Sequence, residues 1–171
     1  MNDKSNIGTT EVNNNQATLR FTRTLAHPAD VIWQALTDQA KFSVWFNAEA
    51  KFDARENGSI DVLSGPFHWT GAITTWQPTK VFEYEYNMAP SDEVPTGATT
   101  MMRWELTPAG DDTTLTFTHS GLGSTYGFAP GAHVVLDRLA AYLDGKELPD
   151  FMKYYEEIEP LYTVWNAEET K

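Results

Sequence analysis

The stretch FTRTLAHPADVIWQALTDQAKFSVWF, residues 21–46, predicts a strand followed directly by two short helices. Phe21, Arg23 and Leu25 alternate with threonines, which is the period-2 pattern of a strand. Pro28 ends that strand and suits a first helical turn. The apolar residues that follow recur at helical spacing, and Thr37-Asp38 ends the first helix and supplies a cap for the second. This uncommon opening decides the architecture.

The rest of the chain predicts a meander of strands and one long helix. Strand patterns cover residues 48–53, 59–63, 67–76, 81–86, 99–107 and 113–120, and residues 131–143 carry an apolar stripe at helical spacing. Such a helix buries its stripe best across the concave face of a curved antiparallel sheet. We therefore expect an α+β fold in which about six to seven strands wrap around the long C-terminal helix.

The two ends of the chain differ from this central part. Residues 1–16 are polar and rich in asparagine, so we expect a flexible N-terminal tail. Residues 17–145 should form the folded domain. The aromatic segment 146–171 should add a helix that Asp150 caps and Pro160 interrupts, packed on the domain or on a partner.

Composition narrows the class of protein. The 171 residues include 12 Lys and Arg against 24 Asp and Glu, and the formal net charge of −12 disfavours binding to nucleic acid or to anionic membranes. The chain has no cysteine, which excludes disulfides, thiolate metal sites and cysteine nucleophiles. No segment approaches the roughly 20 apolar residues of a membrane span, and the N-terminus lacks the pattern of a signal peptide. A cytoplasmic protein is therefore expected.

The run from His27 to Phe46 resembles the opening of the START-like (SRPBCC) helix-grip superfamily, and more narrowly the family of activator-of-heat-shock-protein-90-ATPase homologues. Later landmarks agree with that family in order and spacing: Gly71 with Trp76-Gln77-Pro78, Leu106-Thr107-Pro108 with Thr113-Thr114-Leu115, and His119-Ser120-Gly121-Leu122. The chain departs from many relatives at Gly131-Ala132, where they carry Gly-Trp, and in its aromatic end. The resemblance implies an apolar cavity between helix and sheet. It leaves function open, because the superfamily includes co-chaperone-like domains, lipid carriers, hormone receptors and aromatase/cyclases.

Large aromatic side chains gather on the inward faces of the predicted strands. They either line a ligand cavity or fill the core, and the two interpretations have equal weight. Three of the candidates, Trp45, Phe46 and Trp69, are expected at the cavity entrance. The candidate ligand-binding residues are Trp45, Phe46, Trp69, Tyr84, Tyr86, Trp104, Phe117, His119, Leu136, Leu139 and Tyr142.

Few residues offer chemistry. His119 ends a strand on the inward face, where it is either a polar anchor or general acid/base at a cavity mouth, or, as we favour, a histidine bonded to nearby backbone. Ser120 cannot act with it as a nucleophile, because adjacent strand residues point apart. His133 and Asp137 lack further partners at metal-ligand spacing and are interpreted as a solvated helix face. We expect no catalytic residue, no metal and no cofactor.

The leading functional hypothesis is a non-enzymatic domain whose apolar cavity holds a small hydrophobic or aromatic molecule, with a role in stress response or regulation. One alternative is a co-chaperone-like module that binds a chaperone or a second copy of itself through the aromatic C-terminal segment. The other, which rests on the superfamily resemblance, is an aromatase/cyclase-like enzyme. Such an enzyme needs at least two titratable groups inside the cavity.

Overall fold

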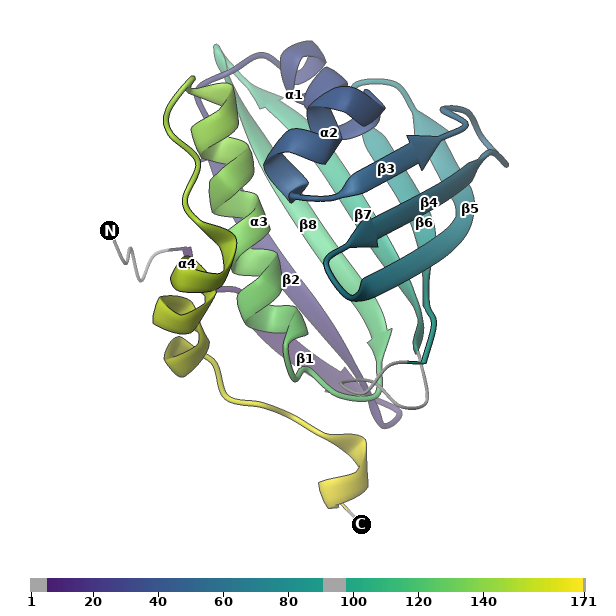
Figure 1. Cartoon of the computed structure of the whole chain (residues 1–171). Coiled ribbons are helices and arrows are strands. Elements are labelled where there is room, and N and C mark those ends of the chain that lie inside the picture. Colours follow the sequence, from purple (N-terminus) through teal and green to yellow (C-terminus); the bar gives the residue numbers. More distant parts are fainter. Residues whose placement is uncertain (1–5, 91–97, 171) are drawn as a thin grey trace.

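In the computed structural model, which describes residues 6–90 and 98–170, an antiparallel sheet of eight strands curves around one long helix (Figure 1). The strand order is β1-β2-β8-β7-β6-β5-β4-β3. The strands are β1 (Thr9–Asn13), β2 (Gln16–Leu25), β3 (Glu49–Phe52), β4 (Ser59–Ser64), β5 (Phe67–Gln77), β6 (Val81–Met88), β7 (Ala98–Ala109) and β8 (Asp112–Leu122). The predicted α+β helix-grip fold is confirmed, with one strand more than the sequence pattern predicts.

The additional strand is β1, which pairs antiparallel with β2 as a hairpin. The prediction of a flexible tail over residues 1–16 is therefore wrong for Thr9–Asn13. Asn14 and Asn15 form the turn with φ angles of 49° and 60°, the left-handed pair that a two-residue hairpin turn requires. Asparagine tolerates this conformation better than other residues that carry a Cβ atom. Asn14 and Asn15 of the asparagine-rich stretch therefore form a hairpin turn.

Substitutions at Asn15 test this hairpin. Asn15→Ala is expected to lower the free energy of unfolding by about 1 kcal/mol. The left-handed conformation is unfavourable for alanine, which has no polar side chain to form a local hydrogen bond. Asn15→Gly is the matched control and should leave stability unchanged or slightly raised, since glycine adopts this conformation freely. Urea unfolding of the two variants measures the difference. Equal stabilities would contradict the turn.

Two short helices, α1 (Ala29–Thr37) and α2 (Gln39–Phe46), follow β2 as predicted. The side chain of Asp38 accepts a hydrogen bond from the backbone N–H of Lys41 at 2.9 Å, which is the predicted cap of α2. Trp33 packs the first helix onto the sheet, with its ring 5.0 Å from that of Trp76. These helices cover one end of the concave face.

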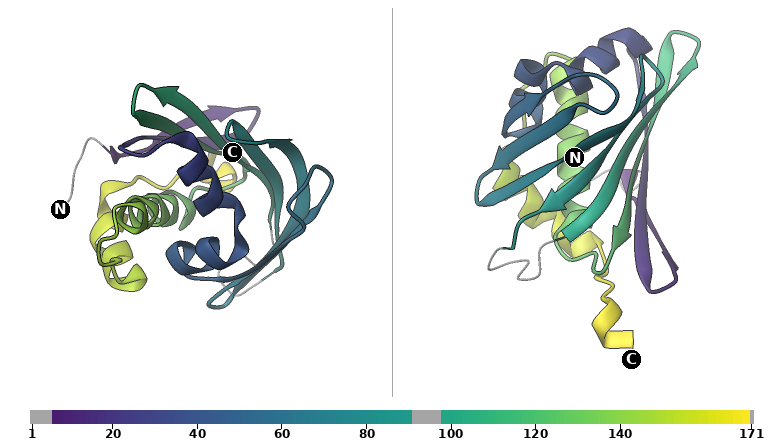
Figure 2. Two further views of the ribbon diagram at one scale, coloured as in Figure 1. Left: turned by 90° about the horizontal axis from the view of Figure 1, so that it is seen from above. Right: turned by 90° about the vertical axis from the view of Figure 1, so that its right-hand side faces the viewer.

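The long helix α3 (Phe128–Leu143) lies within the curve of the sheet, as the view from above shows (Figure 2). It begins three residues before the predicted start at Gly131, because Pro130 falls in the first turn, where no helical hydrogen bond needs its missing N–H. Buried residues lie on most sides of its first three turns, including Ala132, Leu136 and Leu139. The helix is therefore covered on more than its sheet-facing side.

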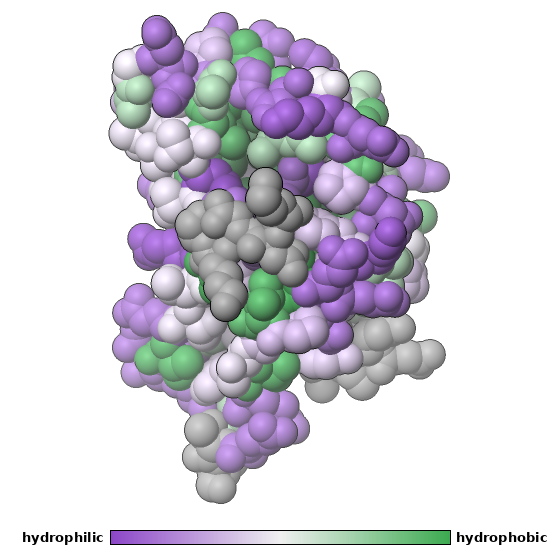
Figure 3. All heavy atoms as spheres, turned by 90° about the vertical axis from the view of Figure 1, so that its left-hand side faces the viewer, coloured by the Kyte–Doolittle hydropathy of each residue, from purple (hydrophilic) through white to green (hydrophobic). Residues whose placement is uncertain are grey.

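That cover is formed by α4 (Phe151–Ile158) and the 3-10 turn η2 (Glu159–Leu161), which pack on α3. A second 3-10 turn, η3 (Ala167–Thr170), follows them. The side chain of Asp150 caps α4, as predicted. Arg138 of α3 links α2 to the segment before α4. Its buried guanidinium donates hydrogen bonds to the carbonyls of Val44 and Trp45 in α2 and to that of Pro149. On the face that includes α4, apolar residues form separate patches among hydrophilic ones (Figure 3).

Candidate functional site

The concave face of the sheet carries a continuous cluster of aromatic rings. The ring centroids of Trp69 and Tyr86 lie 4.5 Å apart, and so do those of Trp104 and Phe117. Trp69 also stacks on Tyr84 at 5.6 Å. These separations are those of rings in contact. The sequence left two interpretations open, a filled core and an open ligand cavity. The contacts between the described rings agree with the filled core.

The predicted binding residues come together in this core. Ten of the eleven candidates are buried, and Tyr142 is half-buried against the same cluster. The expectation that Trp45, Phe46 and Trp69 line an entrance is not met. All three are enclosed because α2 lies over the sheet, and the indole of Trp45 donates to the carbonyl of Ala35 at 2.8 Å. These three side chains hold the helices on the sheet.

A polar pair interrupts the aromatic cluster near the C-terminal end of β8. His119, with 1% of its surface exposed, has its Nε2 atom 2.6 Å from the hydroxyl of Thr100. That hydroxyl donates to the carbonyl of Tyr86 at 3.3 Å, so its oxygen is free to accept the proton of Nε2. We infer that the ring proton sits on Nε2 and that Nδ1 is a hydrogen-bond acceptor.

Burial controls the charge of this site. Desolvation lowers the pKa of His119 to about 3, so the imidazole is neutral at physiological pH. Desolvation also raises the pKa of Tyr84 and Tyr86 well above the ordinary value, so both phenols keep their protons. The Tyr84 hydroxyl accepts from the Trp104 indole at 3.2 Å. The interior is thus apolar and uncharged, with a few fixed hydrogen-bonding groups.

The first turn of α3 closes this end of the interior. The ring of Phe128 lies 5.1 Å from that of His119 and 6.4 Å from that of Tyr86. Phe128 is half-buried, so it stands between the polar pair and the surface. His119 was predicted to face inward. Its partner Thr100 was not predicted, because no sequence spacing links two residues on neighbouring strands.

A groove of about 400 Å³ lies elsewhere, at the outer face of the sheet, where the β1–β2 turn approaches the ends of β7 and β8. Amide and hydroxyl side chains dominate it, with one carboxylate, which makes it unlike the apolar cavity that the sequence predicts. Its lining consists of Asn13, Asn14, Gln16, Thr18, Glu85, Thr99, Thr100, Met101, Ser120 and Gly121.

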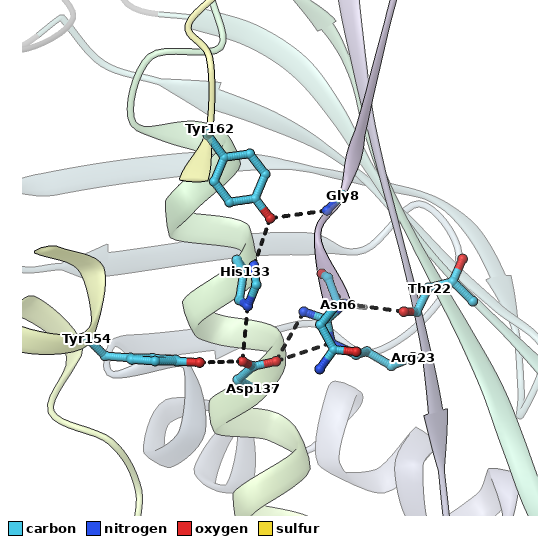
Figure 4. A network of polar contacts seen from close by, with 8 residues as sticks. All are labelled: Asn6, Gly8, Thr22, Arg23, His133, Asp137, Tyr154 and Tyr162. Carbon is cyan, nitrogen blue, oxygen red and sulfur yellow. Dashed lines mark hydrogen bonds and ion pairs between the residues drawn. The ribbon is translucent and has the colours of Figure 1, made fainter. Parts of the chain in front are cut away.

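A second polar cluster lies on the other side of α3, between that helix, β2 and the C-terminal segment (Figure 4). Asp137 accepts two hydrogen bonds from Arg23, at 3.1 and 3.2 Å, and one from the hydroxyl of Tyr154 at 2.7 Å. Its second oxygen also lies 3.2 Å from Nε2 of His133, whose Nδ1 is 2.7 Å from the hydroxyl of Tyr162. The prediction that His133 and Asp137 form a solvated helix face is wrong.

The physical reason is that the C-terminal segment covers this side of α3. One sequence signal pointed to it: Arg23 alternates in phase with the inward residues Phe21 and Leu25, and a buried guanidinium needs a carboxylate. Burial raises the pKa of Asp137, but hydrogen bonds from His133 and Tyr154 and the charge of Arg23 outweigh it. The net pKa of Asp137 is therefore lower than usual.

Neither cluster is a metal site. Within residues 6–90 and 98–170, His, Asp and Glu side chains do not come together in threes at a spacing that would hold an ion. In the same part of the chain, no helix has the length and apolar character needed to cross a membrane.

Residues 26–144 match the family described as "Activator of Hsp90 ATPase homolog 1-like protein". The chain belongs to this family. Solved structures with the same fold include CalU16 from Micromonospora echinospora, at 20% identity and a TM-score of 0.67, covering 92% of this chain and 94% of that one. A conserved protein of unknown function from Enterococcus faecalis, EF2215, is 19% identical with a TM-score of 0.70, over 90% and 89% of the two chains. No curated protein matches the sequence.

The residues that match the Hsp90-ATPase-activator-like family contain the aromatic interior and His119. The segment that carries Tyr154 and Tyr162 lies outside the matched residues. The interior brings together a neutral imidazole and two neutral phenols. A base with a pKa of about 3 and phenols with raised pKa values are poorly matched to proton transfer near neutral pH. The arrangement is suited to holding a molecule by apolar contact and hydrogen bonds.

Proposed function

We propose that this domain is a non-enzymatic binding protein that takes a small hydrophobic or aromatic molecule between α3 and the concave face of the sheet. The observation that carries the proposal is the polar pair of His119 and Thr100 inside an otherwise aromatic interior. Burying an imidazole costs stability, as its lowered pKa indicates. A buried polar group that lowers stability is explained if it orients a bound ligand.

The chemistry of the pair indicates which guest would fit. With the ring proton on Nε2, Nδ1 of His119 is available as an acceptor, so the guest should carry a hydroxyl or another donor on an apolar body. A charged guest is disfavoured, because the surrounding rings cannot solvate an ion. Since the rings are in contact, the guest makes room by displacing the half-buried ring of Phe128 and the neighbouring ring of Tyr86.

The other two hypotheses have less support. The hypothesis of an interaction module rests on the aromatic C-terminal segment. Tyr154 and Tyr162 of that segment instead form hydrogen bonds within the domain. The enzyme hypothesis requires at least two titratable groups inside the cavity, and His119, Tyr84 and Tyr86 meet that requirement. Burial lowers the pKa of the histidine and raises the pKa of both phenols, so the three groups are poorly suited to proton transfer near neutral pH.

A pair of matched ligands tests the proposal. Wild-type protein is expected to bind 2-naphthol about fivefold more tightly than 2-methylnaphthalene, because one hydrogen bond contributes about 1 kcal/mol. His119→Phe should bind the two equally, since the acceptor is gone while the ring volume remains. Fluorescence titration measures both affinities, and His68→Phe, an exposed histidine on β5, is the control. Failure of both compounds to bind the wild-type protein would contradict the proposal.

A further inference from the structure

Two segments meet where α3 begins, next to the His119 end of the interior. We call residues 121–127, from the last two residues of β8 to the residue before α3, the closing loop. We call residues 162–167, between η2 and the start of η3, the strap. Figure 1 shows the strap passing from α4 beneath the first turn of α3. The strap lies outside the residues that match the family.

The first end of the strap is fastened to α3 by Tyr162. Its hydroxyl accepts a hydrogen bond from the backbone N–H of Gly8 at 3.1 Å and is hydrogen-bonded to Nδ1 of His133 at 2.7 Å (Figure 4). The Tyr162 ring also packs 6.2 Å from that of Phe21 on β2. The hydroxyl thus joins the strap to the N-terminal segment and to the helix.

The other end of the strap is fastened to the closing loop through backbone atoms. Thr125 N–H donates to the carbonyl of Trp165 at 2.9 Å, and Trp165 N–H donates to the hydroxyl of Thr125 at 2.8 Å. Ala167 N–H donates to the carbonyl of Gly123 at 3.0 Å. Between these bonds Ser124 and Asn166 face each other as an antiparallel bridge. The strap therefore acts as a short strand laid along the loop.

The closing loop is built to turn at both ends. Gly121 and Gly127 have φ angles of 83° and 74°, a region that favours glycine. The loop leads directly into Phe128, whose ring covers His119. Any outward movement of this loop would carry Phe128 with it and uncover the polar pair.

We propose that the strap is a latch that holds the closing loop, and with it Phe128, over the ligand site, so that its release controls how fast a ligand enters and leaves. The inference rests on the proposed function. It follows from the two fastenings, from the glycines that bound the loop and from the position of Phe128 against His119. A lid of this kind changes rates of association and dissociation together.

A reversible disulfide tests the latch. Ser124 and Asn166 form a non-hydrogen-bonded antiparallel pair, whose Cα atoms lie about 4.5 Å apart and suit a disulfide. The chain has no cysteine, so Ser124→Cys with Asn166→Cys introduces the only thiols. Stopped-flow fluorescence with N-phenyl-1-naphthylamine, a neutral apolar dye, measures the rates. Oxidation is expected to slow binding and release about tenfold or more, and reduction to restore both.

The outcomes separate the two proposals. Equal rates in the oxidised and reduced forms, with the dye still binding, would overturn the latch and leave the proposed function standing. A dye that does not bind in either form would overturn both. Independently of any ligand, Tyr162→Phe should speed hydrogen exchange at the Thr125 amide about tenfold, because it removes one fastening. The exposed Tyr126→Phe on the same loop is the control, and unchanged exchange in Tyr162→Phe would overturn the latch.

Discussion

Asp137→Asn is expected to lower the free energy of unfolding by about 3 to 5 kcal/mol, because it leaves the buried guanidinium of Arg23 without a carboxylate. Arg23 is 5% exposed, and Asp137 also accepts from Tyr154 and His133. One substitution therefore weakens the contacts of β2, α3 and the C-terminal segment at the same time. Urea unfolding at neutral pH measures the effect.

Asp144→Asn is the matched control, since Asp144 lies at the end of the same helix and pairs with His27 and Lys146 at the surface. It should cost at most about 1 kcal/mol. The pKa of Asp137 is lowered in the folded state, so its contribution is present above the ordinary pKa and is lost as pH falls through the folded-state value. Equal losses in Asp137→Asn and Asp144→Asn would contradict the cluster.

The wild-type protein is expected to lose about 2 kcal/mol of stability between pH 6.5 and pH 5 because of His119 alone. Desolvation lowers the pKa of this histidine to about 3 in the folded state, whereas in the unfolded chain it titrates near 6.5. Within that window the unfolded state binds a proton that the folded state excludes. Stability therefore falls as pH falls, with a slope that approaches about 1.4 kcal/mol per pH unit at the acidic end of this window.

His119→Phe should remove this slope, because it removes the titrating group and keeps an aromatic ring in the core. His68→Phe, at an exposed histidine, should keep the slope of the wild-type protein. Chemical unfolding at several pH values compares the three proteins. If the wild type and His119→Phe lose stability in parallel between pH 6.5 and 5, the histidine is not held neutral by burial.

Most of the fold could be predicted from sequence because its signals are local. The strand–proline–helix opening, the alternation in β6 to β8 and the apolar stripe of α3 each lie within one element. The hairpin strand β1 escaped prediction because all five of its residues are exposed and show no apolar alternation. The start of α3 was predicted too late because Pro130 in its first turn resembles a helix break in the sequence.

The site was harder to predict because its contacts join distant residues. The inward position of His119 follows from strand alternation, but its pairing with Thr100 depends on the register of β7 and β8. Whether aromatic side chains fill a core or line a cavity depends on packing distances, which composition does not contain. The Arg23–Asp137 pair spans more than a hundred residues, so only the unusual inward arginine hinted at it.

Intermolecular nuclear Overhauser effects between labelled protein and unlabelled 2-naphthol would locate a bound molecule. Binding within the helix-grip interior predicts contacts to protons of Phe117, His119 and Phe128, on β8 and the first turn of α3. Contacts confined to the outer groove, at Thr18, Met101 and Ser120, would contradict it, as would the absence of any contact at a saturating concentration.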